Sequence, residues 1–331
     1  MCYINLEEKM LKKLTNILLT FAMFTILNVA NANEFPDKTI TIVCNWSAGG
    51  GQDTVSRLIA KFASEKAGVP VVVNNVTGAG GSAGVRFASE AKPDGYTIGI
   101  IGSSFVARNY SNPNATELDG IDPLAFFGPD PGALSVRSDT GISNLKEYFS
   151  KIKKDPGSLL NGNDPPGGSS AIVASLIEST YNVNMSQVPY KGYAATKAAL
   201  LSGEVQSATL PVAQVSEEHK AGSIKIIGVT STKRHFKAPD VPTFQEQGFN
   251  LVAGDWRALF LPKGVSYSRR LLLENLFVNT MRDPDFKKAA ENAGYVVTPM
   301  DSVDTKIKII NHDANVYPIL LKAGLVSQRK K

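Results

Sequence analysis

Cysteine and histidine are both scarce in this sequence. Its 331 residues include two cysteines, Cys2 and Cys44, so at most one disulfide is possible. The three histidines, His219, His235 and His312, lie far apart among polar neighbours and make no metal-binding pair. We therefore predict no metal site.

A strong excess of one charge is missing as well. Lys and Arg number 35 against 30 Asp and Glu, which gives a formal net charge of +5. A dedicated nucleic-acid binder would cluster its cations, so we expect no nucleic-acid partner. The hydrophobic share of 43% is ordinary for a globular protein and excludes disordered, collagen-like and polytopic membrane chains. The length suggests about two domains.

The common catalytic signatures do not occur. The chain has neither a G-x-S-x-G nucleophile elbow nor a G-x-x-x-x-G-K-[ST] phosphate loop. Gly78-x-Gly80-x-x-Ala83 is a loose match to a dinucleotide fingerprint, but the next predicted strand offers no acidic residue for a ribose hydroxyl. We predict a protein that is not an enzyme, with no catalytic residues and no cofactor. A dinucleotide-dependent enzyme is the alternative.

An apolar run near the N-terminus resembles an export signal. Lys12 and Lys13 precede the apolar residues 17–30, and Ala30-Asn31-Ala32 matches an A-x-A cleavage pattern. This predicts a signal peptide over residues 1–32, cleaved after Ala32, and a periplasmic mature protein. Residues 1–9 precede the basic region, as translation from an upstream start codon would give. An uncleaved anchor is the alternative, although the run is short for a membrane span. Cleavage would leave Cys44 alone, so stability would come from the core.

The mature chain alternates strand and helix patterns. Residues 39–46, 69–76 and 96–102 are predicted strands separated by helices, an order that favours a parallel sheet with helices on both faces. Asp53 is the predicted N-cap of the first helix and Gly68 its C-cap.

A second α/β region follows. Residues 111–131 are rich in Asn, Pro, Asp and Gly and are interpreted as an irregular domain boundary. Beyond it we predict helices over 143–153 and after the turns at 167–170 and 191–193, the latter helix ending at Gly203. The predicted strands are 158–163, 185–190, 206–212, 224–230, 251–262 and 295–299.

Glycine-rich turns follow several of the predicted strands. Ser47–Asp53, Thr77–Gly81 and Gly167–Ser170 share the order strand, small-residue loop, helix start, and Gly102–Ser104 and Lys191–Tyr193 are sparser versions. In a doubly wound sheet such loops meet at one edge, where ligands bind. Glycine lets backbone amides approach a ligand, and a helix start adds partial positive charge, so the turns predict an anion site. The structural alternative is that the glycines only make tight turns.

Eight ordered segments carry a resemblance to a known family. They are WSAGGGQD (46–53), NNVTGAGGSAG (74–84), KPDGYTIGIIGSS (92–104), KKDPGSLLNGN (153–163), VPYKG (188–192), LLSGEVQ (200–206), KAGSIKIIGVTSTKR (220–234) and APDVPTFQEQGF (238–249). Together they resemble the Bug-type periplasmic solute-binding proteins of tripartite tricarboxylate transporters.

The resemblance implies a hinged, two-lobed α/β periplasmic binding protein fold of type II-like architecture, with a ligand cleft between the lobes. The first domain would comprise 33–124 and 232–331, and the second 125–231. The implied ligand-binding residues are Ser47, Ala48, Gly49, Gly50, Asp53, Gly78, Ala79, Ser103 and Ser104 in the first domain, and Gly168, Ser169, Tyr190, Lys191 and Gly192 in the second.

The function implied is capture of a small carboxylate, a di- or tricarboxylate or related organic acid. The protein would act as a monomer, close its hinge, and deliver the ligand to the membrane subunits of a tripartite tricarboxylate transporter. A sensory role, with signal passed to a sensor kinase, is the alternative within this fold. The sequence departs from the family pattern at four places, which are Asn45, Gln52, Val76-Thr77 and Gln206. The changes at Gln52 and Gln206 put the identity of the ligand in question.

Overall fold

The computed structural model describes residues 35–322 and 324–328. Residues Lys38–Lys331 make one compact unit, and Met1–Asp37 a separate one of which only Phe35–Asp37 are described. The predicted signal peptide therefore lies outside the described residues. Within them, none of the helices combines the length and the apolar character needed to cross a membrane.

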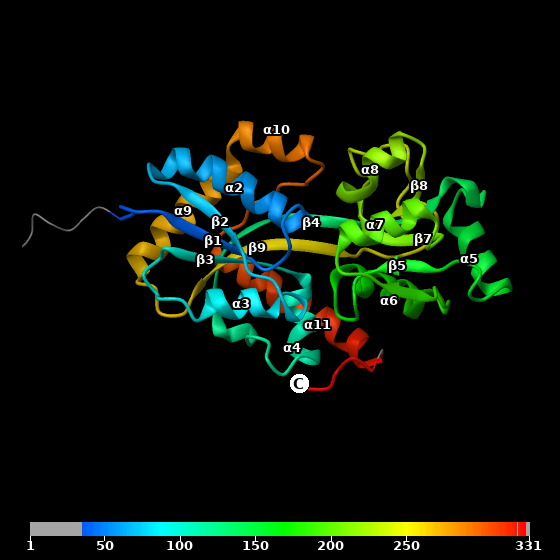
Figure 1. The fold of residues 1–331 in the computed structure, drawn as a ribbon, viewed down its shortest axis with the longest axis horizontal. Coiled ribbons are helices and arrows are strands. Elements are labelled where there is room, and N and C mark those ends of the chain that lie inside the picture. The colour runs from blue at the N-terminus through cyan, green and yellow to red at the C-terminus, as the bar shows by residue number, and fades with distance from the viewer. Residues whose placement is uncertain (1–34, 323, 329–331) are drawn as a thin grey trace, which may run out of the picture. The chain divides into compact units, whose positions relative to one another are not determined.

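A mixed β-sheet organises the unit Lys38–Lys331 (Figure 1). Its strand order is β2-β1-β3-β9-β4-β7-β5-β6, and β8 pairs with β4. The strands are β1 (Ile40–Cys44), β2 (Val71–Asn75), β3 (Thr97–Gly102), β4 (Ile121–Arg137), β5 (Asn161–Asn163), β6 (Gln187–Pro189), β7 (Ser207–Pro211), β8 (Ile224–Val229) and β9 (Gly254–Pro262).

The long strand β4 belongs to both parts of this sheet. Its first half, Ile121–Pro131, pairs antiparallel with β9, which in turn pairs antiparallel with β3. Its second half, from Gly132 onwards, pairs antiparallel with β7 and β8. The parallel pairs β1–β2, β1–β3, β5–β6 and β5–β7 lie on either side. The strands β4 and β9 thus run from one group of parallel strands to the other.

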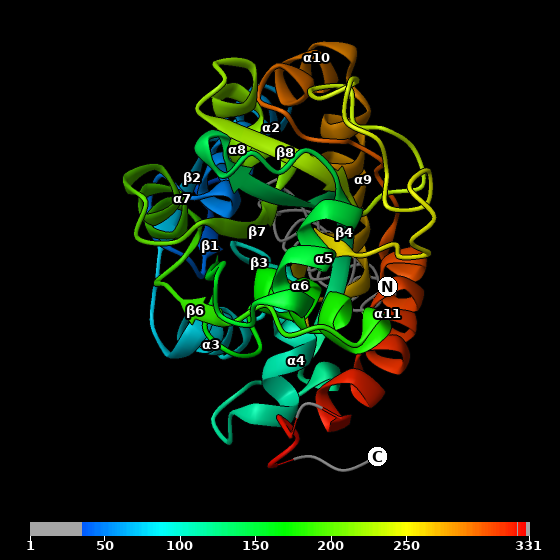
Figure 2. The same cartoon turned by 90° about the vertical axis from the view of Figure 1, so that its right-hand side faces the viewer.

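Helices cover both faces of the sheet (Figures 1 and 2). In the first part, α2 and α10 lie on one face and α3, α4 and α11 on the other, and α9 packs against α2 and β4. The helices are α2 (Gly51–Ala67), α3 (Ser82–Ser89), α4 (Ser103–Ser111), α5 (Leu145–Lys154), α6 (Ser169–Tyr181), α7 (Tyr193–Ser202), α8 (Val212–Lys220), α9 (Tyr267–Arg282), α10 (Pro284–Asn292) and α11 (Ser302–Lys322), with short 3-10 turns at Ala79–Gly81, Leu118–Gly120 and Ser138–Thr140.

The described part confirms most of the predicted elements and corrects five interpretations. The stretch 111–131 is not an irregular boundary, because the longest strand begins inside it. Residues 295–299 form no strand; beside them Met300 makes an isolated bridge with Phe126. Residues 212–220, of which only the first was included in a predicted strand, form helix α8. The sheet is mixed rather than purely parallel.

The fifth correction concerns the start of α2. Gly50 is its N-cap, and Asp53 lies in the first turn, where its carboxylate accepts a hydrogen bond from the Gly49 amide at 2.9 Å. Gly68 is confirmed as the C-cap, with a left-handed φ of 68°. Gly203 likewise ends α7 with a φ of 87°. The division into two domains at residues 124–125 and 231–232 stays a prediction.

Candidate ligand-binding site

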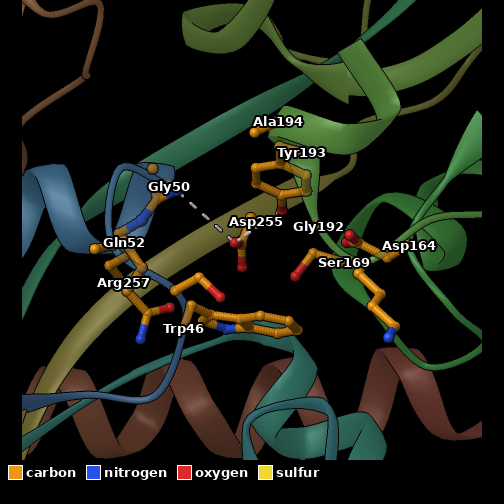
Figure 3. A pocket seen from close by; sticks show the side chains of 14 residues that line it. Trp46, Gly50, Gln52, Asp164, Ser169, Gly192, Tyr193, Ala194, Asp255 and Arg257 are labelled. Carbon is orange, nitrogen blue, oxygen red and sulfur yellow. Dashed lines mark hydrogen bonds and ion pairs between the residues drawn. The ribbon is translucent and has the colours of Figure 1, made fainter. Parts of the chain in front are cut away.

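A small cavity of about 90 Å³ lies where several helix starts meet (Figure 3). It is lined by residues that follow β1, by two residues of β9 and by residues that follow β5 and β6. The lining residues are Trp46, Ser47, Ala48, Gly50, Gly51, Gln52, Asp164, Ser169, Lys191, Gly192, Tyr193, Ala194, Asp255 and Arg257. We call this cavity the front pocket.

Three helices begin at the front pocket. Gly51 and Gln52 open α2, Ser169 opens α6, and Tyr193 and Ala194 open α7. Amides in the first turn of a helix have no acceptor within the helix, and the helix dipole adds partial positive charge there. None of the three N-cap residues is a side-chain cap. The pocket therefore has backbone donors suited to an anion.

Arg257 supplies a buried positive charge to the same pocket. Its side chain is 1% exposed, and its Nη2 lies 2.7 Å from Asp130 and 4.0 Å from Asp255. Burial opposes the charge, but these two carboxylates outweigh burial and raise the pKa of Arg257 above its usual value. Within the described residues, Nε and Nη1 of Arg257 are buried and have no hydrogen-bond partner. The guanidinium is thus charged and has donors left for a ligand.

The carboxylate of Asp255 is already well supplied with hydrogen bonds. Its Oδ1 accepts from the Ser103 amide at 2.8 Å, from the Ser103 hydroxyl at 2.7 Å and from the Trp256 amide at 2.9 Å. The phenol of Tyr193 donates to Oδ2 at 3.3 Å. Asp255 therefore acts as an internal anion at the start of α4, where it ties α4 to α7.

Asp164 is a second acid in the pocket, with fewer partners. It is 3% exposed, and its Oδ2 accepts from the Ser170 amide at 3.3 Å. Burial raises the pKa of Asp164 to about 6, the Ser170 hydrogen bonds oppose that rise, and the Asp255 carboxylate adds to it. At neutral pH the pocket therefore holds an acid close to its titration range.

The structure brings six of the fourteen predicted site residues to the front pocket. These are Ser47, Ala48, Gly50, Ser169, Lys191 and Gly192. Four others, Ser103, Gly49, Asp53 and Gly168, lie next to the lining residues and support them. The Ser103 hydroxyl lies 2.8 Å from that of Ser169, the Gly49 amide donates to Asp53, and Gly168 is the N-cap of α6. Burial opposes the charge of Asp53, but hydrogen bonds from Arg57, Gly49 and Asn75 lower its pKa.

The remaining predicted residues, Gly78, Ala79, Ser104 and Tyr190, do not line the pocket. The Tyr190 phenol instead donates to Glu204 at 2.9 Å. The second glycine-rich turn is covered by Arg108, whose guanidinium would lie 2.5 Å from a β-carbon at Gly80 and whose Nη1 donates to the Pro166 carbonyl at 3.0 Å. Ser104 lines a separate small cavity beneath the Arg108 side chain.

Three charged residues of the site, Asp164, Asp255 and Arg257, were missed by the sequence analysis. Asp255 and Arg257 flank Trp256 in the strand GDWRALFLP, which is buried along nearly its whole length. Charged side chains in such a strand are costly unless they are paired, so their presence was a usable signal. Among residues 35–322 and 324–328, no cluster of three potential metal ligands occurs.

The chain is similar to known bacterial proteins in both sequence and structure. A UPF0065 protein of Bordetella pertussis is 30% identical over 315 residues, which is 93% of this chain and 97% of that protein. The solved structure of the periplasmic binding protein BugD has a TM-score of 0.82 and 26% identity, and covers 89% of this chain and 100% of its own.

A second solved structure, R. palustris Rpa4515 with adipate, has a TM-score of 0.82 at 22% identity and covers 88% of this chain and 99% of its own. At that identity the likeness concerns the fold, which is the mixed α/β fold of two-lobed periplasmic binding proteins. The family model described as tripartite tricarboxylate transporter family receptor matches residues 55–325. Since this match spans most of the sequence, the chain belongs to the receptor family of tripartite tricarboxylate transporters.

Proposed function

We propose that this protein captures a small carboxylate in the front pocket and delivers it to the membrane subunits of a tripartite tricarboxylate transporter. The observation that carries the proposal is the meeting of three helix starts with the unpaired donors of Arg257. Family membership supports the receptor role, and the adipate in Rpa4515 shows that a neighbour of this fold takes a dicarboxylate. Export to the periplasm and a monomeric state are parts of the same proposal.

A ligand carboxylate fits the donors on the α2 side of the pocket. The amides of Gly51 and Gln52 and the guanidinium of Arg257 would all donate to its oxygens. Hydrogen bonds to a charged group contribute about 1.5–3 kcal/mol each, more than those to a neutral oxygen. A neutral amide or sugar would gain less from the helix starts.

A second carboxylate would meet the α7 side of the pocket. Lys191 is exposed and lies beside Gly192 at the rim of the pocket. Its ammonium is a point charge on a flexible stem, so it would favour a second anionic group without fixing its geometry. We therefore propose a dicarboxylate or tricarboxylate, with the hydroxyl groups of Ser47 and Ser169 as further donors.

Closure of the two parts around the ligand would complete the site. The contacts Ser103–Ser169 and Arg108–Pro166 join residues on opposite sides of β4 and β9. A ligand that touches both sides would favour the closed arrangement by its extra contacts there.

A sensory role would use the same closure and is the second candidate, whereas a dinucleotide-dependent enzyme has no supporting observation.

A thermal-shift screen of dicarboxylates and their mono-amides tests the proposal. A ligand at 100 times its Kd should add about 2.7 kcal/mol to stability. The diacid should bind about tenfold more tightly than its mono-amide. Lys191→Met should reduce this affinity ratio by about threefold, because an exposed charge contributes little. The control is Lys233→Met, which removes an exposed charge elsewhere and should leave the ratio unchanged. Equal affinities for acid and amide in the unmodified protein would refute the anion site.

A further inference from the structure

A larger cavity lies behind the strand that carries Arg257. Successive side chains of a strand point to opposite faces, so Arg257 faces the front pocket while Trp256 faces away from it. The second cavity has a volume of about 600 Å³ and includes Trp256 in its lining. We call it the back cavity. It is not used by the function proposed above.

Most of the back cavity has apolar walls. Helix α6 contributes Ile172, Val173 and Leu176, and helix α11 contributes Val316 and Ile319. Pro129 and Pro131 of β4 and the loop residues Val252 and Ala253 extend the apolar surface. These walls suit an apolar body of the size of a phenyl ring with a short chain.

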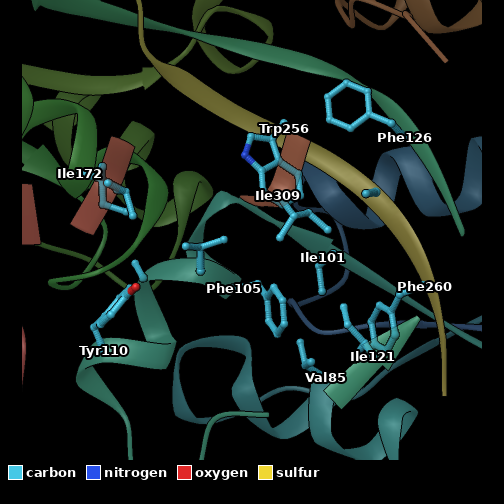
Figure 4. Close-up of a cluster of buried hydrophobic side chains, with 14 of the residues drawn as sticks. Val85, Ile101, Phe105, Tyr110, Ile121, Phe126, Ile172, Trp256, Phe260 and Ile309 are labelled. Atoms are coloured by element: carbon cyan, nitrogen blue, oxygen red, sulfur yellow. The ribbon is translucent and has the colours of Figure 1, made fainter. Parts of the chain in front are cut away.

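One end of the cavity carries polar groups that lack partners. Trp256 is 3% exposed, and its Nε1–H has no acceptor in the described part of the chain. Nε2 of His312, whose ring lies 5.5 Å from the indole, is also buried and unpartnered there. Figure 4 shows the indole nitrogen on the side of the ring toward Ile172, another residue of the cavity wall. A buried donor without an acceptor destabilises the protein, and an acceptor on a ligand would remove that cost.

The charge at this end is positive. Lys308 lines the cavity one helical turn before His312. Burial lowers the pKa of His312 to about 4, so its ring is neutral at pH 7 and Lys308 carries the charge. Asp255 is the one carboxylate in the lining, and its hydrogen bonds come from Ser103, Tyr193 and its neighbouring amide.

We infer that the back cavity is a second binding site, which takes a small amphipathic monoanion with an apolar body and one carboxylate. The apolar body lies between α6 and α11, and the carboxylate accepts from the Trp256 indole and pairs with Lys308. The back cavity and the front pocket share Asp255 alone among their lining residues, so the test of the back cavity does not depend on the transported ligand.

Calorimetric titration with 4-phenylbutyrate tests the inference on the full mature protein. We expect saturable binding at one site. Ile319→Trp, which fills the cavity, should lower the affinity for 4-phenylbutyrate at least tenfold. The matched control is Ile310→Trp, because Ile310 lies on the same helix, is 55% exposed and does not line the cavity. Lys308→Met should weaken binding by about two- to fivefold, whereas Lys306→Met should not.

Fluorescence gives a second readout, because the chain has two tryptophans and Trp46→Phe leaves Trp256 as the single emitter. In that variant 4-phenylbutyrate should change the emission along the calorimetric binding curve, and neutral 4-phenylbutyramide should require a higher concentration. Absence of binding overturns the inference. Binding that survives Ile319→Trp but is lost in Gly50→Val also overturns it, since the probe would then occupy the front pocket.

Discussion

At the residue scale, the buried guanidinium of Arg257 links stability to binding. Its partner Asp130 is 2% exposed, so Arg257→Met would leave a buried carboxylate without its counter-charge. We expect the free energy of unfolding to fall by about 3–5 kcal/mol, measured by urea denaturation. The control is Arg234→Met, which breaks an exposed pair with Glu246 and should cost less than about 1 kcal/mol. Equal losses in the two variants would contradict this account of Arg257.

Asp164 gives a prediction about pH. Its pKa in the folded protein is raised to about 6 from 3.8, so the folded state holds its proton more tightly than the unfolded state does. The stabilisation is therefore present in acid and is lost as the pH rises from about 4 to 6, by at most about 3 kcal/mol. Asp164→Asn should flatten this part of the stability curve, measured by urea denaturation at several pH values. An unchanged slope in the variant would show that other groups cause it.

Some residues of the site could be predicted from the sequence and others could not. Ser47, Gly50 and Lys191 lie in turns whose composition already indicates a site, and the structure brings them to one pocket. Asp255 and Arg257 lie inside a strand, where a composition pattern indicates burial but not which charges meet. Arg257 meets Asp130 across the β4–β9 pairing, and that pairing depends on the register of two strands more than a hundred residues apart.

At the element scale, the start of α2 forms one wall of the front pocket. Gly50 has a φ of −78°, which any residue can adopt, and an added β-carbon would lie 3.3 Å from the Ser47 carbonyl oxygen. Gly50→Val should therefore fold but place methyl groups where the ligand binds. We expect at least tenfold weaker binding of the best diacid by calorimetry, about 1.4 kcal/mol. Ala67→Val, at the other end of the same helix, is the control, and equal binding in both variants would exclude this wall from the site.

The elements were predictable where the local signal agreed with the fold. The glycine-rich turns begin α2, α6 and α7 as predicted. At α7 the N-cap Gly192 has a positive φ of 93°, and at α6 a β-carbon on Gly168 would clash with the β-carbon of Asp164, so both positions favour glycine. The strand β4 was missed because Pro123, Pro129 and Pro131 argue against a strand. In that half β4 has β9 as its one paired strand among those described, and a strand paired on one side tolerates prolines better than a central strand does.

At the scale of the whole molecule, the proposed closure can be tested with a reversible crosslink. The hydroxyl oxygens of Ser103 and Ser169 lie 2.8 Å apart, so cysteines at both positions would be close enough to form a disulfide in this arrangement. We expect the double variant to oxidise faster with the diacid bound and then to release it at least tenfold more slowly, until a reductant restores exchange. The Ser103→Cys variant alone controls for the altered contact with Asp255. Oxidation at the same rate with and without ligand would contradict closure.

The prolines of β4 have a mechanical consequence for such a motion. Pro129 lies opposite Trp256 and Pro131 opposite Gly254, so two positions of the β4–β9 ladder have no amide hydrogen to donate. Fewer available donors allow fewer cross-strand hydrogen bonds, which would lower the stiffness of the sheet where β4 passes from one group of strands to the other. Twisting the sheet there would cost little elastic energy. The populations of the open and closed arrangements would then depend mainly on ligand binding and little on the resistance of the sheet to bending.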